Sequence, residues 1–445
     1  MRRRGHHSDT TRRQFLGRSA TLAAAAGFAA AGETRAQTST AATVQVEPFW
    51  GEHQGGIATA AQKHSYFAVF DLTTDKRSDV ADLLRAWTIA GARMAEAKTA
   101  QPLEGGLKPV MVSKPQAKAY DHYQPANLTG VASDSGEALG LSPSRLTVTF
   151  GLGAGLFLKD GIDRYGLAAQ KPTAFVDMPR FVGDQLVESR TGGDFSIQAC
   201  ADDQQVAFHA VRQLARIAAD IATIRWAQSG FLPDRSVDET PRNLMGFKDG
   251  TVNPSTSDAS TMEKFVWVGE EGPTWMRGGS YLVVRRIRMA LEHWDRMNTG
   301  FQEQTFGRHK YSGAPLGKSE EFDALDLDAN DKDGNPVIAE NAHVRLAAAA
   351  TNDGAQFLRR PYSYNDGVNF TAERWPPWRQ GLEYDAGLFF VSYQRDPRNG
   401  FIKVYERMAK FDMLNQFVTH VGSGLFACPR GANPDSFIGR ELFGA

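Results

Sequence analysis

Two strand-and-helix patterns recur in the two halves of the chain, and this repetition limits the possible folds more than any other feature of the sequence. Residues 66–69 (Tyr-Phe-Ala-Val) resemble residues 281–284 (Tyr-Leu-Val-Val). Residues 195–198 (Phe-Ser-Ile-Gln) resemble residues 389–392 (Phe-Phe-Val-Ser), and an aspartate follows each at the same spacing. A duplication of this kind predicts two similar α+β halves, each an antiparallel sheet with helices on one side.

The recurring segments combine strand and helix signals. Residues 66–72 and 195–200 are rich in aromatic and β-branched side chains, as strands are. Helices are indicated behind them by apolar residues at helical spacing, namely Val80, Leu83, Leu84 and Trp87, and then Val206, Ala210, Leu214, Ile217 and Ile221. Further strands are predicted at residues 280–287 and 388–393, and a helix is predicted around residues 401–417.

The first 36 residues have the composition of an export signal. Residues 11–17 (Thr-Arg-Arg-Gln-Phe-Leu-Gly) resemble a twin-arginine motif, and a weakly apolar, alanine-rich run follows at residues 20–31. Residues 34–36 then provide small side chains suited to signal peptidase. The segment predicts export through the twin-arginine pathway to the periplasm or the extracellular space; a basic tail beside a short buried helix is the alternative.

The rest of the chain divides into three predicted segments. We expect an N-terminal extension at residues 37–60, a first half at residues 61–235 and a second half at residues 236–445. Long loops are predicted at residues 98–144, which are rich in Pro, Gly and polar side chains, and at residues 318–335, which carry seven acids.

Charge and cysteine content exclude several classes of protein. Without residues 1–36 the chain has 43 basic and 49 acidic side chains, about −6 in net charge, whereas binding to nucleic acid requires clustered Lys and Arg. We therefore expect no nucleic-acid partner.

No stretch reaches about 18 uninterrupted apolar residues, so no membrane span is expected. Cys200 and Cys428 form neither a disulfide framework nor a CxxC site, and the sequence leaves their pairing open.

The sequence contains no recognisable motif for a protein-ligated metal ion. Its ten histidines include no HExxH or similar pair, and no cysteine accompanies them, so a zinc site is not indicated. A single histidine can still serve as an axial ligand to haem, which supplies the other iron ligands itself.

Two clusters of residues suit such a cofactor. Residues 246–254 (Gly-Phe-Lys-Asp-Gly-Thr-Val-Asn-Pro) place Asp249 between glycines, which can hold its carboxylate on a tight loop beside a flat ligand. An ordinary Asp-Gly turn is the alternative. The second cluster contains His343 and, sixteen residues later, Arg359. A lone histidine in such a stretch is also compatible with a purely structural role.

These segments, in this order, resemble the dye-decolourising peroxidases, and above all their exported, iron-uptake-associated deferrochelatase/peroxidase members. The resemblance covers nearly the whole chain after the signal and includes residues 49–57, 246–250, 305–310, 341–346, 359–364 and 387–394. A GxxDG motif alone has little specificity, but the ordered set is highly specific.

The resemblance implies an α+β fold of two ferredoxin-like halves, of the dimeric α+β barrel superfamily, with haem b in the second half. Carried over position by position, His343 becomes the proximal iron ligand, Asp249 the distal acid and Arg359 the distal arginine. Further cofactor contacts are implied for Gly250, Thr251, Val252 and Phe389 or Phe390.

The chemistry of peroxide cleavage suits these roles. Asp249 can shuttle a proton between the two peroxide oxygens, and Arg359 stays charged and can stabilise the leaving oxygen. A hydrogen-bond acceptor for the second nitrogen of His343 would strengthen the ligand. Asp366 is one candidate for this acceptor, with an ordinary solvated loop position as its alternative.

One segment departs from the family pattern. Residues 347–350 are four alanines, where family members usually have Asn-Pro-Arg or His-Pro-Arg near a haem propionate. We expect weaker propionate anchoring, or a substitute such as Arg345 or Arg308.

The resemblance implies a haem peroxidase that uses hydrogen peroxide to oxidise dyes, phenols or porphyrins. Release of iron from haem within an iron-uptake system, with partner proteins of that system, is the alternative function. A catalytically silent haem carrier is a third, disfavoured because haem binding alone needs neither Asp249 nor Arg359. A homo-oligomer is also expected.

Overall fold

The computed structural model describes residues 45–103, 133–234, 239–372 and 380–444. The predicted export signal and most of the predicted loop at residues 98–144 lie outside these ranges. Residues 318–335 are described, and they form the predicted loop, without helix or strand apart from one isolated β-bridge at Asn330. No helix among the described residues is long and apolar enough to cross a membrane.

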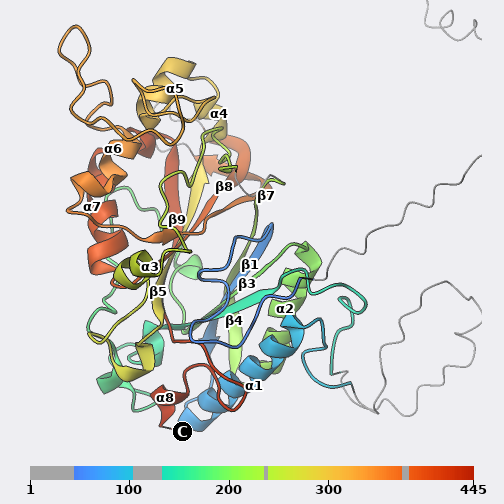
Figure 1. Cartoon of the computed structure of the whole chain (residues 1–445). Helices are drawn as coiled ribbons and strands as arrows, with labels where there is room; N and C mark the ends of the chain where they lie inside the picture. The colour runs from blue at the N-terminus through green and yellow to red at the C-terminus, as the bar shows by residue number, and fades with distance from the viewer. Residues whose placement is uncertain (1–44, 104–132, 235–238, 373–379, 445) are drawn as a thin grey trace, which may run out of the picture. The chain divides into compact units, whose positions relative to one another are not determined.

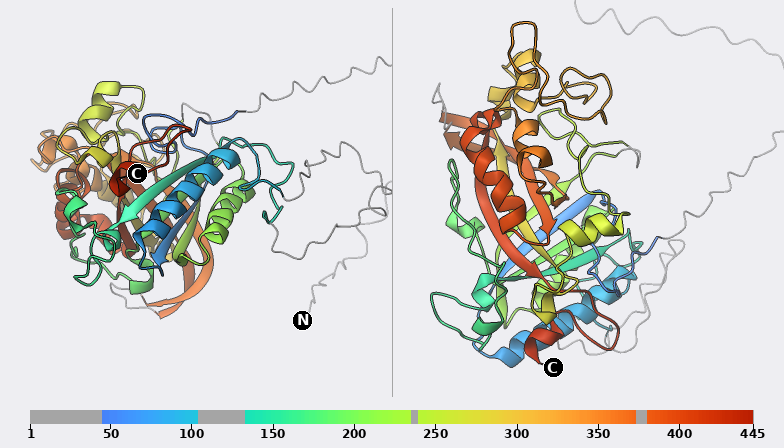
Figure 2. Two further views of the ribbon diagram at one scale, coloured as in Figure 1. Left: turned by 90° about the horizontal axis from the view of Figure 1, so that it is seen from below. Right: turned by 60° about the vertical axis from the view of Figure 1, so that its left-hand side comes forward.

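The first half is a βαββαβ unit. Its elements are β1 (His64–Leu72), α1 (Arg77–Ala95), β2 (Thr147–Gly153), β3 (Phe195–Ala201), α2 (Gln204–Ile217) and β4 (Ala222–Phe231). The strands are antiparallel in the order β2-β3-β1-β4, which is the ferredoxin-like arrangement. The predicted apolar stripe of α1 is buried, whereas Ile221 lies beyond the end of α2. Figure 2 shows α1 and α2 side by side on one face of these strands.

The second half repeats this arrangement. Its elements are β5 (Ser280–Met289), α4 (Leu291–Trp294), α5 (Thr299–Phe306), α6 (His343–Ala347), β6 (Leu358–Arg359), β7 (Tyr362–Ala372), β8 (Gln380–Gln394), α7 (Lys403–Phe411) and β9 (Val418–Cys428). The order β9-β5-β8-β7 matches that of the first half. The segments matched in the sequence are the first strands, β1 and β5, and the third strands, β3 and β8. The predicted duplication is therefore confirmed. The short helices α3 (Ala259–Phe265) and α8 (Arg440–Phe443) lie outside the repeat.

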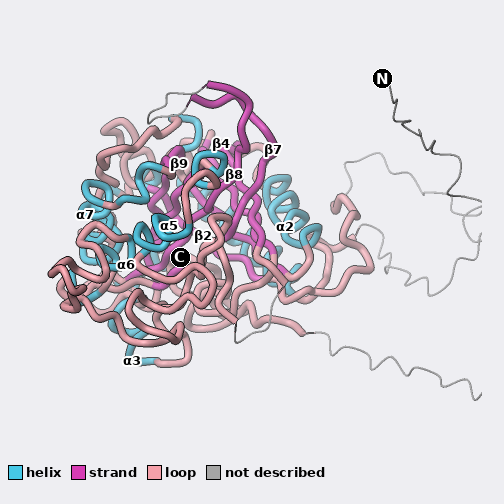
Figure 3. Tube along the Cα trace, turned by 90° about the horizontal axis from the view of Figure 1, so that it is seen from above, coloured by secondary structure: helices cyan, strands magenta, loops and turns pink. Residues whose placement is uncertain are grey.

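The two half-sheets join into a closed antiparallel barrel. β2 pairs with β9 at Leu152 and Ala427, and β4 pairs with β7 at Phe231 and Ser363. β6 pairs with β8 within the second half. Side chains from both halves fill the space between the sheets, where Phe67 contacts the rings of Trp226, Phe389 and Phe426. α4, α5 and α6 lie toward one end of this unit and α1 and α8 toward the other (Figure 1). α2 lies on one side of the strands, and α6 and α7 on the other (Figure 3).

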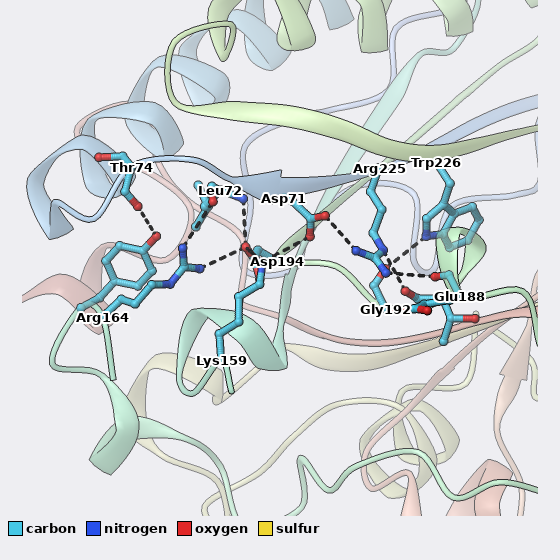
Figure 4. A network of polar contacts seen from close by, with 12 residues as sticks. Asp71, Leu72, Thr74, Lys159, Arg164, Glu188, Gly192, Asp194, Arg225 and Trp226 are labelled. Carbon is cyan, nitrogen blue, oxygen red and sulfur yellow. Dashed lines mark hydrogen bonds and ion pairs between the residues drawn. The ribbon is translucent and has the colours of Figure 1, made fainter. Parts of the chain in front are cut away.

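A polar network reinforces the first half at the end of β1 (Figure 4). Asp194 is almost fully buried, and its Oδ2 accepts hydrogen bonds from Leu72 N at 2.9 Å, Lys159 Nζ at 2.9 Å and Arg164 Nη2 at 3.1 Å. Arg225 Nη1 donates to Asp71 Oδ2 at 2.9 Å in the same region. The two cations compensate the buried Asp194 carboxylate for its lost hydration. Asp194 therefore holds the loop that follows β2 against β1.

Cys200 and Cys428 are both buried and both carry free thiols. They lie on β3 and β9 and pack as small core residues.

Candidate active site

His343 is the first residue of α6 and has a buried carboxylate partner. Its Nδ1 lies 2.7 Å from Oδ2 of Asp412, which is 69 positions later in the chain. Asp412 follows the last residue of α7 in an extended conformation, and its other oxygen accepts from Leu414 N at 2.8 Å. Because the carboxylate accepts the Nδ1 hydrogen, Nε2 keeps a lone pair that can bind a metal.

Opposing effects act on the pKa of His343. Burial is the largest single effect and lowers this pKa, but the charge and hydrogen bond of Asp412, together with the Asp249 charge, outweigh it, and the net shift is upward. The charges of Asp249 and Arg359 also act on His343, the first raising its pKa and the second lowering it. Both side chains therefore lie within electrostatic range of the imidazole.

Asp249 and Arg359 form a direct ion pair. Nη1 of Arg359 lies 2.7 Å from Oδ1 of Asp249, and both side chains are partly buried. The loop holding Asp249 is fixed by a hydrogen bond from its own backbone N to Pro241 O at 2.8 Å. Gly250, the next residue, has φ +123°, a conformation that side chains rarely adopt.

Asn253 joins the Asp249 loop to the strand that carries Arg359. Its Nδ2 donates to Arg359 O at 2.9 Å, and its Oδ1 accepts from Arg359 N at 2.9 Å. A single side chain thus satisfies both backbone groups of Arg359, which lies on the two-residue strand β6. The loop and the strand are held in register at the point where their two charged side chains meet.

Comparison with known proteins identifies the relatives of this chain. The model described as "Dyp-type peroxidase, N-terminal" matches residues 54–232, and "Dyp-type peroxidase, C-terminal" matches residues 240–433. A deferrochelatase of Escherichia coli O6:K15:H31 (strain 536 / UPEC) is 35% identical over 406 residues, which cover 89% of this chain and 87% of the relative. The chain belongs to the Dyp-type peroxidase family.

Other family members extend the comparison. A dye-decolorizing peroxidase of Thermobifida fusca (strain YX) is 36% identical over 404 residues, covering 87% of this chain and 83% of that protein. Among solved structures, a DyP-type peroxidase from Streptomyces coelicolor has a TM-score of 0.76 at 36% identity, covering 90% of this chain and 98% of its own. Ferric DtpA from Streptomyces lividans gives the same four values.

In this Dyp-type peroxidase the two candidate phenylalanines of β8 point to opposite faces. Arg359 pairs with Ser392, so its side chain lies on the face of β8 that also carries Phe390. Phe390 contacts Phe357 and Phe401. Phe389 is fully buried against Phe67, between the two sheets. The resemblance implied that Phe389 or Phe390 lines the cofactor pocket. Phe389 does not fit this role, because its ring lies between the two sheets.

The other predicted cofactor contacts differ in their surroundings. Thr251 Oγ1 donates to Glu321 Oε1 at 3.0 Å, whereas Val252 is largely exposed. Arg345 Nε donates to Ile338 O at 2.9 Å. Arg308 is buried, and its Nη1 donates to Gly313 O at 2.7 Å and Glu321 O at 3.0 Å. The hydrogen bonds of both arginines hold loops together, and propionate binding by either stays a prediction.

Two residues of the site were not assigned these roles from the sequence. The suggested acceptor for His343, Asp366, instead binds Arg286 Nη2 at 2.8 Å, and the acceptor is Asp412. Asp412 lies inside the predicted helix at residues 401–417, which in the structure ends at Phe411. Asn253 was noticed as part of a turn motif, but no local pattern shows that it binds a residue 106 positions away.

Proposed function

We propose that this chain is a haem b peroxidase that reduces hydrogen peroxide and oxidises organic donors such as dyes, phenols or porphyrins. The observation that carries this function is the grouping of His343, held by a buried carboxylate, with the Asp249–Arg359 ion pair. Haem binding alone requires the histidine and its carboxylate partner but not the Asp249–Arg359 ion pair.

The residues present fit haem b. His343 offers Nε2 as a single axial ligand, which would give up any proton when the metal binds, and the Asp412 hydrogen bond increases its basicity. Gly250 and Thr251 follow Asp249 on the loop, where the backbone can approach a flat ligand. When bound, haem supplies the iron chemistry that the protein's own side chains lack.

The ion pair supplies proton transfer and charge stabilisation. Asp249 takes a proton from one peroxide oxygen and returns it to the other, and a positioned acid-base group of this kind contributes roughly 10²–10⁴-fold in rate. Arg359 stays protonated and donates hydrogen bonds to the oxygen that gains negative charge. Its contact with Asp249 orients both groups before peroxide enters.

Stopped-flow absorbance of the haem-loaded protein mixed with hydrogen peroxide tests this function. We expect a rapid change of the Soret band in the wild type, a slow change in Asp249→Asn and in Arg359→Ala, and loss of normal haem ligation in His343→Ala. Asp331→Asn, in the loop at residues 318–335, is the matched control and should behave like the wild type. A Soret band that does not respond to peroxide in the wild type would contradict the proposal.

Iron release from haem is the second candidate function, supported by similarity to a deferrochelatase. Incubation of the protein with haem, without peroxide, should then produce the fluorescence of iron-free porphyrin. Proteins of an iron-uptake system would be the partners in that case.

Export is proposed from residues 1–36, and homo-oligomer formation from the family resemblance. Replacement of both Arg12 and Arg13 by Lys should keep the protein in the cytoplasm if the twin-arginine pathway carries it, and cell fractionation would show this. Light scattering of the purified protein measures its oligomeric state.

A further inference from the structure

Asp412 also lines a cavity of about 370 Å³. The cavity lies among the end of α7, the turn that follows it, the start of β9 and residues 182–183. Its volume suits a ligand of a few to about a dozen heavy atoms, at the small end of the usual range for ligand sites. None of the roles given above to His343, Asp249 and Arg359 uses this space.

His420, on β9, provides a polar group in the wall of the cavity. It is 6% exposed, and its Nδ1 lies 3.0 Å from Nε of Arg285. Because arginine can only donate, Nδ1 is the acceptor and the ring hydrogen lies on Nε2. Within the described residues Nε2 has no hydrogen-bond partner. The side-chain atoms that are both unpartnered and closed off from solvent do not include it, so Nε2 is accessible. This N–H group therefore reaches the open space of the cavity.

The surroundings of His420 keep it uncharged and fixed. Burial lowers its pKa well below the ordinary value, and the Arg285 charge lowers it further. Arg285 is itself fully buried and is held by Asp184, with Nη2 2.7 and 2.8 Å from the two carboxylate oxygens. The ring of Tyr405 stacks on the imidazole at 4.6 Å between centroids. His420 is thus a rigid, neutral hydrogen-bond donor.

The rest of the cavity indicates what such a donor would bind. Two exposed apolar residues of its lining, Val182 (62% exposed) and Phe411 (60% exposed), lie toward solvent, and the wall includes Val418. The wall also includes the Asp412 carboxylate and Lys410, whose ammonium group is paired with Glu406 at 3.1 Å, so an anionic ligand would meet like charge at Asp412 and an already paired cation. A neutral aromatic molecule with an acceptor oxygen satisfies the donor and covers the apolar surface.

We propose that this cavity binds a small neutral phenol, whose oxygen accepts the hydrogen bond of His420 Nε2. As a consequence that rests on the proposed peroxidase function, the phenol bound beside Asp412 would be an electron donor. It loses one electron, which reduces the peroxide-oxidised enzyme by one equivalent, and its hydroxyl proton, which passes to water. The phenoxyl radical then leaves. Asp412 connects the cavity to His343 by a direct hydrogen bond.

Calorimetric titration of the haem-loaded protein with phenol, without peroxide, tests the binding site. His420→Leu should weaken binding about 10-fold, the loss expected for one unmade hydrogen bond. His420→Gln should retain binding, because an amide can accept from Arg285 and donate into the cavity. His64→Leu, a histidine of β1 that does not line the cavity, is the control and should match the wild type.

Two further measurements distinguish phenol bound in this cavity from phenol bound at the iron or elsewhere on the protein. Val182→Trp narrows the cavity from an exposed position, so it should weaken phenol binding while leaving the Soret band and melting temperature unchanged, even if His420→Leu unfolds. Cyanide bound to the iron should leave phenol affinity unchanged. Unaltered affinity in Val182→Trp, or loss of phenol binding with cyanide, would overturn the proposal.

Steady-state kinetics then test the donor role separately. The KM for phenol should rise about 10-fold in His420→Leu, in line with its binding defect, while the rate with a dye too large for the cavity stays unchanged. An unchanged KM for phenol alongside weakened binding would overturn the donor role and leave the binding site in place. Failure of the wild type to react with peroxide would instead contradict the proposed peroxidase function, since phenol binding is measured without peroxide.

Discussion

Nδ1 of His343 donates a hydrogen bond to the carboxylate of Asp412 at 2.7 Å, and this contact joins the start of α6 to the end of α7. α7 stops at Phe411, and the extended backbone of Asp412 directs its carboxylate to the imidazole. The same carboxylate binds Leu414 N, which fixes its orientation. A change at Asp412 should therefore alter the ligand strength of His343 before it alters the fold.

Asp412→Asn should weaken haem binding or peroxide reactivity by roughly 10–100-fold, the usual effect of removing the partner of a metal-bound histidine. The amide is nearly the same size, but it is neutral and makes His343 a weaker electron donor to iron. Haem titration measures the binding and peroxide stopped-flow measures the reactivity. The iron(III)/iron(II) reduction potential, which should rise, reports the ligand strength of His343. Asp366→Asn is the control, because Asp366 pairs with Arg286 and not with the imidazole. Equal potentials in the two variants would contradict the role of Asp412.

Asn253→Ala should slow the reaction with peroxide while haem binding through His343 persists. The variant loses both hydrogen bonds to the backbone of Arg359, so the guanidinium is no longer held against Asp249. We expect a decrease of about 10–100-fold, as for a modest misplacement of a catalytic group. Peroxide stopped-flow measures the rate, and the Soret band verifies haem ligation. Ser255→Ala, two residues further along the chain, should have a much smaller effect, because the exposed Ser255 hydroxyl pairs with Ser257 at 2.8 Å.

The fold was predictable because short sequence patterns within single strands and helices show the duplication. Strands β1, β3, β5 and β8 each carry a run of apolar or aromatic residues, and their similarity in pairs implies the repeated order of the sheet. The orientation of Phe389 was not predictable, because a strand buried on both faces has no alternation to show which side faces the pocket. Asp412 was missed because its partner lies far away in the chain and an apolar helical pattern surrounds it.

Asp194→Asn should destabilise the first half by about 3 kcal/mol, since the change leaves the partly buried Arg164 without its counter-charge and leaves Lys159 with only Asp71, 3.5 Å away. Urea unfolding should show a lower midpoint with an unchanged slope. Asp177→Asn is the matched control: Asp177 pairs with Lys171 but is 91% exposed, so its loss should change stability by less than about 1 kcal/mol. Equal effects of the two changes would show that the Asp194 network does not stabilise the fold.

The pH dependence of stability tests whether His420 is neutral in the fold. Its pKa in the folded protein lies well below that of an unfolded histidine, about 6.5. Below that pH the unfolded chain binds a proton at His420 that the folded chain excludes, so folding loses stability as pH falls, by up to about 1.4 kcal/mol per pH unit. Above pH 6.5 this contribution is constant.

His420→Gln removes this single titration and keeps the hydrogen bond to Arg285. Between pH 7 and pH 5 the wild type should therefore lose about 2 kcal/mol more unfolding free energy than the variant. His64→Gln is the control and should follow the wild type. Other groups near His420 are the same in the wild type and the variant, including Arg285, Tyr405, Lys410 and Asp412. Parallel curves for the wild type and His420→Gln would mean that His420 takes up a proton in the fold, which is incompatible with a neutral donor in the cavity.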